Sequence, residues 1–187
     1  ISSVSAAGAL NNLDSEIPHW SFNQVKQEAQ ANWQKQLDKI EVQSPDTGVL
    51  ENFYTAMYHA ALSPTIYMDV DGRYRGLDQG IHSAKGFTNY TTFSLWDTYR
   101  ALHPLYNILN PSRNADMVNS MLAHYDQSVL HMLPVWSHYA NDNWCMIGYH
   151  AVSVISDSYF KEQRDFDIEK AYQASVKSSS YDTINIS

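Results

Sequence analysis

The sequence predicts an all-α fold in which helical hairpins stack side by side, as in an α/α toroid. Three observations lead to this prediction. Apolar residues recur every three or four positions in six segments, short connections alternate with longer loops, and a turn-rich insertion falls around residues 65–93. The chain has 187 residues, 44% hydrophobic and 17% charged, which suffices for one sizeable core. We expect a single partial domain over residues 1–187, with no boundary inside it.

The first two helices are expected on either side of the Pro-Asp-Thr-Gly turn at residues 45–48. Ser21 is a candidate N-cap, and Gln24 three positions later completes the pattern of a capping box. Pro64 is expected to end the second helix. The apolar positions are Phe22, Val25, Ala29, Trp33, Leu37 and Ile40 in the first helix, and Phe53, Tyr54, Met57, Tyr58, Ala61 and Leu62 in the second.

The insertion at 65–93 is expected to be irregular or to contain a β-hairpin. Residues 67–76 are rich in turn formers, and residues 87–93 are rich in Thr and aromatics, which favours a short extended piece. Asp69 and Asp71 resemble the start of an EF-hand loop, but position twelve of that loop is Gly80 where a bidentate Glu is required. We therefore expect a tight turn in which Asp71 bonds its own backbone.

Four helices are expected after the insertion. The third runs from about 94 to 109 with a kink or break at Pro104. The fourth follows the helix-breaking Asn-Pro-Ser segment at 110–112. The fifth begins near Trp144, and the sixth is capped by the Asp-Phe-Asp segment at 165–167.

Trp96, Asp97 and Arg100 lie within one turn of the expected third helix. An indole can face the apolar surface of a sugar ring while charged groups bond its hydroxyls, so these residues are candidates for a sugar site. The alternative is structural: Trp96 belongs to the core, and Asp97 forms an ion pair with Arg100 at i, i+3.

A second candidate cluster is formed by Asn141, Asp142 and Cys145. The short polar side chains at 141–143 either cap the helix expected near Trp144 or line a cleft at the mouth of the helical ring. Cys145 and His150 are five residues apart and fall on different faces of a helix, which argues against a thiol–imidazole nucleophile pair. Cys145 is expected to be packed or to line a pocket.

Charge and composition exclude several functional classes. The net charge of −8 argues against nucleic acid as a partner. No apolar run is long enough to span a membrane, and the single cysteine allows no intrachain disulfide. The eight histidines form no metalloprotease motif. Because the chain begins at Ile1 and ends in a polar stretch, both ends are expected to be cuts through something longer.

Three segments together resemble glycoside hydrolase family 92, the calcium-dependent, inverting exo-α-mannosidases. They read Y-M-D-V-D-G-R-Y-R-G at 67–76, T-T-F-S-L-W-D-T-Y-R-A-L-H-P-L at 91–105, and L-P-V-W followed by N-D-N-W-C-M-I-G-Y-H-A-V-S-V-I-S-D within 133–157. The resemblance implies the first part of an (α/α)6 barrel whose partners are the rest of that barrel and an N-terminal β-sandwich. The family's E-G-N-A-W-like and G-N-D-D-like segments, which carry the general acid and base, do not occur here. No catalytic residue is therefore assigned, and calcium is implied without identifiable ligands.

The resemblance also implies which residues hold substrate. Trp96 and Asp97 match the family's W-D pair at the terminal mannose, and Arg100 is expected to orient Asp97 or reach a sugar hydroxyl. Asn141, Asp142 and Cys145 match a segment that usually reads G-N-E-T-x-C, although Ala140 replaces the Gly and Asp142 the Glu.

The implied activity is removal of terminal α-linked mannose, of α-1,2-mannosidase type, from a mannose-containing glycan. The implied location is periplasmic, cell-surface or secreted in a bacterium. The sequence does not indicate whether α-1,2, α-1,3, α-1,4 or α-1,6 linkages are preferred. The alternative is a non-catalytic carbohydrate-binding or helical interaction module.

Overall fold

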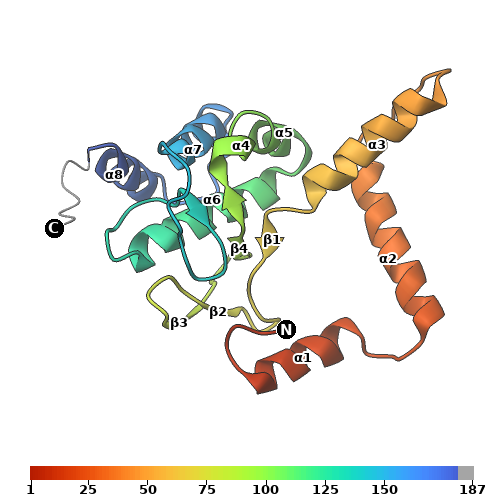
Figure 1. The fold of residues 1–187 in the computed structure, drawn as a ribbon, viewed down its shortest axis with the longest axis horizontal. Coiled ribbons are helices and arrows are strands. Elements are labelled where there is room, and N and C mark those ends of the chain that lie inside the picture. The colour runs from red at the N-terminus through yellow and green to blue at the C-terminus, as the bar shows by residue number, and fades with distance from the viewer. Residues whose placement is uncertain (181–187) are drawn as a thin grey trace.

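The structure, a computed structural model, describes residues 1–180 and is mainly helical, as the sequence predicts (Figure 1). No helix in this part of the chain is long and apolar enough to cross a membrane. The helices are α1 (Ala6–Glu16), α2 (Phe22–Leu37), α3 (Thr47–Ala61), α4 (Leu95–Thr98), α5 (Leu102–Leu109), α6 (Pro111–Gln127), α7 (His150–Phe160) and α8 (Ile168–Ser179). The strands are β1 (Thr65–Ile66), β2 (Arg73–Arg75), β3 (Ile81–Ser83), β4 (Tyr90–Thr91), β5 (Phe93–Ser94) and β6 (Trp136–Ser137).

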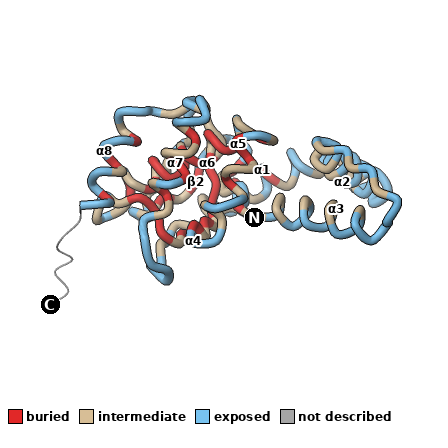
Figure 2. The backbone as a smooth tube through the Cα atoms, turned by 90° about the horizontal axis from the view of Figure 1, so that it is seen from above, coloured by how far each residue is buried: buried red, intermediate tan, exposed pale blue. Residues whose placement is uncertain are grey.

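Helix α6 is the centre of the core, and α5, α7 and α8 pack against it. Its first residue is Pro111, which has no N–H, so the helix start carries one unpaired donor fewer. Figure 2 shows the buried segments concentrated in α5 to α8 and the strands next to them. The largest fully buried side chains include Tyr106, Phe93, Leu95, Met117, Met121 and His103.

The insertion and the residues directly after it contribute strands to three two-stranded antiparallel pairs. They are β1 with β4, β2 with β3, and β5 with β6. The tight turn expected at Asp71 is confirmed, because the backbone N–H of Arg73 donates to Asp71 Oδ1 over 3.1 Å. Gly72, with φ +81°, supplies the left-handed residue that this turn needs.

Helix α1 was not expected from the sequence, and polar contacts hold it to the insertion. Asn12 Nδ2 donates to Asp69 Oδ1 over 2.9 Å, and Ser2 Oγ donates to Asp69 Oδ2 over 2.7 Å. Asp69 is buried, so these two donors satisfy a carboxylate that water does not reach. A Cβ on Gly8 would lie 2.3 Å from Asp69 Oδ2, so only glycine lets α1 approach this closely.

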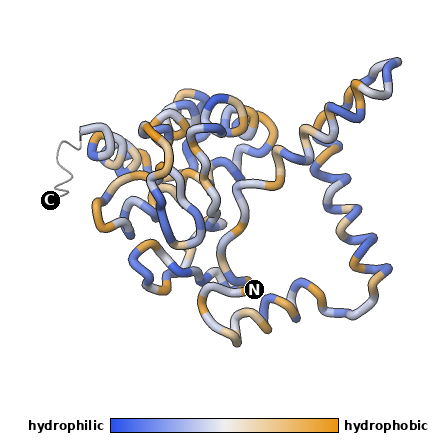
Figure 3. Tube along the Cα trace, viewed as in Figure 1, coloured by the Kyte–Doolittle hydropathy of each residue, from blue (hydrophilic) through white to orange (hydrophobic). Residues whose placement is uncertain are grey.

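Helices α2 and α3 pair with each other and extend away from the core as a hairpin (Figure 1). Trp33 of α2 and Tyr58 of α3 contact with ring centroids 4.5 Å apart. No residue in either helix is buried, although apolar and polar positions alternate along both (Figure 3). Periodicity thus predicted both helices correctly, but it did not show that they stand apart from the core.

Caps explain where two of the expected helices begin. The Ser21 side chain accepts from the backbone N–H of Gln24, which confirms this N-cap. The Gln24 side chain bonds Glu28 instead of the backbone of Ser21, so the second half of the capping box does not form. Asp167 accepts from the backbone N–H of Lys170 and is the N-cap of α8, as expected.

Two expected helices differ from those observed. The helix expected from 94 to 109 is divided into α4 and α5, with a turn at 99–101. Pro104 is in the first turn of α5, where no intrahelical hydrogen bond is lost, so the interruption precedes this proline. The helix expected near Trp144 begins at His150, and residues 143–149 are irregular. The division into α4 and α5 adds one helix and the unexpected α1 adds another, so the expected count of six is wrong: residues 1–180 contain eight.

Candidate functional site

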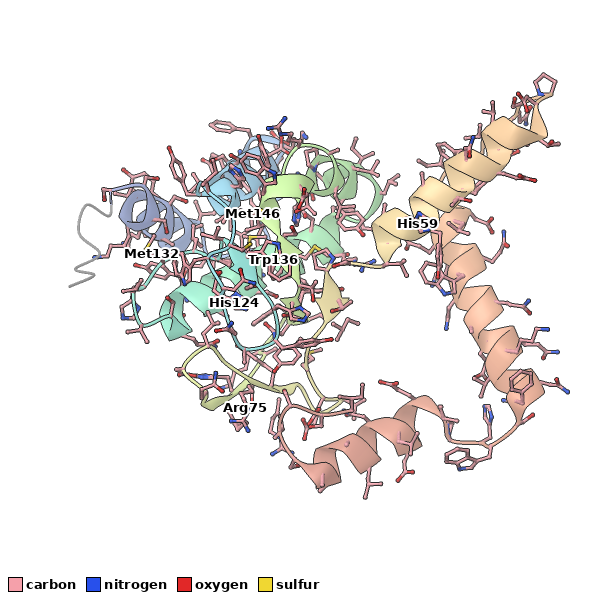
Figure 4. All side chains as sticks on the ribbon, in the orientation of Figure 1. His59, Arg75, His124, Met132, Trp136 and Met146 are labelled. Atoms are coloured by element: carbon pink, nitrogen blue, oxygen red, sulfur yellow. The ribbon has the colours of Figure 1, made fainter. Side chains whose placement is uncertain are left out.

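The pairing of β5 with β6 brings the two candidate clusters to the same part of the molecule. Phe93 pairs with Ser137 and Ser94 with Trp136. Trp96 and Asp97 follow β5 directly in α4, and Asn141, Asp142 and Cys145 follow β6 in its loop. Figure 4 labels Trp136 and Met146 in the part of the molecule that contains the core helices, whereas His59 lies on α3.

Trp96 is not buried by the described residues, which leave 37% of its surface exposed. Its indole stacks on the imidazole of His150, with ring centroids 5.5 Å apart and an interplanar angle of 29°. The indole is therefore not buried within residues 1–180, and its assignment to a sugar site stays a prediction. A partly exposed indole with a supported face is the arrangement required of a sugar platform.

Asp97 and Arg100 do not pair with each other among the ion pairs of the described residues. Asp97 Oδ2 accepts from Ser94 Oγ over 2.5 Å. Arg100 Nε donates to the hydroxyl of Tyr99 over 2.8 Å, and the guanidinium lies 5.2 Å from the centre of the Tyr99 ring. The expected ion pair is wrong, and so is the expectation that Arg100 orients Asp97. Ser94 orients Asp97 instead.

Asp142 organises the loop that follows β6. Its Oδ2 accepts from the backbone N–H of Val135 over 2.8 Å, and its Oδ1 accepts from those of Trp136 and Trp144 over 3.1 and 3.2 Å. A carboxylate that accepts three backbone N–H groups fixes the loop around it. The prediction of a helix cap here is wrong, because these acceptors serve loop turns and no helix begins at Trp144.

Asn141 and Cys145 are exposed on this loop. The backbone N–H of Cys145 donates to Asn143 Oδ1 over 2.9 Å, which closes a second local turn. Cys145 is thus not packed in the core. Within residues 1–180, no hydrogen bond joins Asn141, Asp142 or Cys145 to Trp96 or Asp97.

The backbone around the two clusters is strained. Thr92, Tyr139, Ala140 and Trp144 have φ values of +68°, +40°, +39° and +55°, a region that residues other than glycine seldom adopt. Such strain concentrates at binding and catalytic sites, where neighbouring contacts hold it in place. Here the Asp142 hydrogen bonds and the bond from the backbone N–H of Tyr139 to Thr91 Oγ1, 2.8 Å long, are contacts of that kind.

Sequence reasoning missed two residues of this region, Tyr99 and His150. Tyr99 stacks on His150 with ring centroids 4.4 Å apart, and it also receives the Arg100 hydrogen bond. The available signal was the i, i+3 spacing of Trp96 and Tyr99, which places both aromatic rings on one face of a helical turn.

The described residues provide no metal site. Within residues 1–180, no group of three or more His, Cys, Asp or Glu side chains is arranged to hold a metal ion. Carboxylate and carbonyl oxygens are the ligands that calcium requires, usually six to eight of them. Residues 1–180 therefore contain no cluster of carboxylates from which calcium ligands can be assigned.

A model of the glycosyl hydrolase family 92 catalytic domain matches residues 8–186. The chain belongs to glycosyl hydrolase family 92. The match includes both candidate clusters and the core helices that support them. A comparison with curated proteins found no match.

Solved structures of this family superpose closely on the chain. The family GH92 α-mannosidase BT3965 from Bacteroides thetaiotaomicron is 52% identical, with a TM-score of 0.94 over 98% of this chain and 25% of that one. The structure of the same protein in complex with mannoimidazole gives 53% identity and a TM-score of 0.90, over 97% of this chain and 24% of that one. The inverting mannosidase BT2199 from the same organism is 28% identical, with a TM-score of 0.85 over 92% of this chain and 23% of that one.

The chain thus spans about a quarter of the length of these family members. Its helices match part of the helical domain of the family, which confirms the all-α prediction. The assignment to glycoside hydrolase family 92 is likewise confirmed.

Proposed function

We propose that the chain forms part of an α-mannosidase catalytic domain and holds the terminal mannose of a glycan while other parts of the domain cleave it. The observation that carries this proposal is the 52% identity to an α-mannosidase over 98% of the chain. The partly exposed indole of Trp96 and the carboxylate of Asp97, adjacent in the sequence of α4, support it, because they offer a sugar one apolar face and one hydroxyl acceptor.

In this proposal the residues have different tasks. Trp96 contacts the sugar ring, and Asp97 uses the oxygen that Ser94 leaves free to accept a hydroxyl. Asp142 holds the loop that presents Asn141 and Cys145, since its own oxygens are engaged by three backbone N–H groups. Arg100 acts through Tyr99, to which it is bonded.

The cleavage step requires groups from outside this chain. Inversion at the anomeric carbon needs a carboxylic acid at the leaving oxygen and a carboxylate that activates water, far enough apart to admit that water. We place both in the remaining part of an (α/α)6 barrel, with a β-sandwich as a further partner. Calcium is proposed as the cofactor, with ligands from those parts, and the family resemblance is its support.

The test is mannose release from an α-1,2-linked mannobiose by a full-length polypeptide that contains this chain. We expect release, its loss on chelation of calcium, and its recovery when calcium is restored. Trp96→Ala and Asp97→Asn should each lower kcat/KM by about tenfold or more, because each removes a contact to the bound sugar. Lys26→Ala, an exposed residue of α2, is the control that should change nothing.

Retained glycan binding without release would favour the alternative of a carbohydrate-binding module. Wild-type binding and release by both site variants would favour a helical interaction module and would contradict the site. We also propose a periplasmic, cell-surface or secreted location, which fractionation of cells with an antibody to this chain would test.

A further inference from the structure

We infer that His150 is a positioning residue of the proposed sugar site, which sets the orientation of Trp96 by stacking against its indole. This inference rests on the proposed function, because it assigns His150 a task only if Trp96 contacts substrate. None of the sequence motifs considered above gives His150 such a role.

His150 joins two rings that come from a different segment of the chain. It is the first residue of α7, whereas Trp96 lies in α4 and Tyr99 is the residue that ends α4. The imidazole is nearly parallel to both rings, at 29° to the indole and 28° to the phenol. In the described part of the chain, His150 provides the only ring contact of Trp96. Among the aromatic rings of the described residues, His150 is therefore the one that supports the indole.

The backbone before α7 is shaped to fit the imidazole. Gly148 has φ +91°, and a Cβ at that position would lie 2.7 Å from His150 Cε1 and 3.1 Å from its Nδ1. Any other residue would both strain the backbone and push the ring away from its place. Glycine at 148 is thus a requirement for the observed position of His150.

Stacking, not hydrogen bonding, fixes this ring. The Nε2 atom of His150 is buried and has no hydrogen-bond partner among the described residues. A flat ring without that nitrogen should therefore serve as well, which separates the proposal from a role in proton transfer. His150→Phe keeps a flat ring, whereas His150→Leu keeps apolar bulk without one.

The experiment measures kcat and KM for α-1,2-linked mannobiose with the full-length polypeptide. His150→Ala and His150→Leu should raise KM about tenfold with a smaller change in kcat, because a misoriented platform weakens sugar binding. His150→Phe should stay within about threefold of the wild-type KM. His82→Ala is the matched control, since His82 also contacts a tyrosine, Tyr74, with ring centroids 5.9 Å apart, but lies in the β2–β3 hairpin.

The double variant Trp96→Ala with His150→Ala tests whether His150 changes KM through Trp96. If His150 acts through Trp96, the second substitution adds nothing once the indole is gone. Additive losses, or a wild-type KM in His150→Leu, would overturn the inference. If His150→Ala does not fold, the comparison of Phe with Leu at this position decides the question alone. An active enzyme whose KM is unchanged by Trp96→Ala would instead overturn the proposed sugar contact.

Discussion

His103 and Asn114 form a hydrogen bond of 2.8 Å between His103 Nδ1 and Asn114 Oδ1, and both residues are fully buried. Asn114 Nδ2 donates to Asn107 Oδ1 and to Ser158 Oγ, which fixes the amide orientation. Asn114 Oδ1 is therefore the acceptor, and His103 carries its proton on Nδ1. These four side chains link α5, α6 and α7 at the centre of the core.

Acid should destabilise the fold through its buried histidines. Burial lowers the pKa of His103 and of His124 to about 4, from an ordinary value of 6.5. Because the folded pKa lies below the unfolded one, protonation favours the unfolded state. Stability is then constant above about pH 6.5 and falls as the pH drops toward 4. At pH 5 the loss should be about 2 kcal/mol for each histidine.

Urea unfolding at pH 7 and pH 5 measures this loss. His103→Gln should remove part of the difference between the two pH values, whereas His59→Gln, at an exposed position on α3, should leave it intact. Equal stability at both pH values in the wild-type chain would contradict the assignment.

Asn114→Ala should cost about 2 to 4 kcal/mol of unfolding free energy. The substitution leaves His103 Nδ1 and Asn107 Oδ1 without their Asn114 partner, in a region that water does not reach. Asn119→Ala, on the same helix, loses one exposed bond to the carbonyl of Asp165 and should cost less than about 1 kcal/mol. Similar losses for the two variants in thermal or urea unfolding would count against a buried network.

Helices with regularly spaced apolar residues could be predicted from the sequence. Elements and residues that are positioned by polar or stacking contacts could not. Helix α6 was expected because Met117, Val118 and Met121 recur on its buried face. Helix α1 was missed because it docks through Asn12 and the absence of a side chain at Gly8, and neither leaves an apolar stripe.

The same limit applies to the candidate site. The residue types within one helical turn, and then the family resemblance, indicated Trp96 and Asp97, and the structure gave their exposure and partners. His150 was not identifiable, since its contacts come from a segment about fifty residues away. The helix expected at Trp144 was wrong because φ is +55° there, which a right-handed helix excludes.

Ala140→Gly should raise stability by about 0.5 to 1 kcal/mol. Ala140 has φ +39°, and relief of this strain exceeds the extra freedom that glycine gives to the unfolded chain. Ala29→Gly is the opposite control: this residue is exposed within α2, and its substitution should lower stability by about 1 kcal/mol. A loss of stability in Ala140→Gly would show that the loop does not hold this conformation in solution.

Asp142→Ala should release the loop that follows β6 without unfolding the core. The three backbone N–H groups of Val135, Trp136 and Trp144 would lose their acceptor, so we expect hydrogen exchange to rise by about tenfold or more at these amides. Asp78→Ala removes a carboxylate from the turn between β2 and β3 and should raise exchange at Gly80 only. Unchanged protection at 135–144 in the Asp142 variant would remove the loop-organising role.

The contacts of Asp69 have a consequence for the connectivity of the molecule. Residues 17–64, which contain α2 and α3, leave the core after α1 and return to it at β1. Hydrogen bonds connect the residues before this segment to those after it. Asn12 and Ser2 donate to Asp69, and Arg75 Nε donates to the carbonyl of Ser3 over 3.0 Å. A protease cut between α2 and α3 would therefore leave the N-terminal piece in contact with the rest of the chain through the Asp69 and Arg75 hydrogen bonds and the packing of α2 on α3.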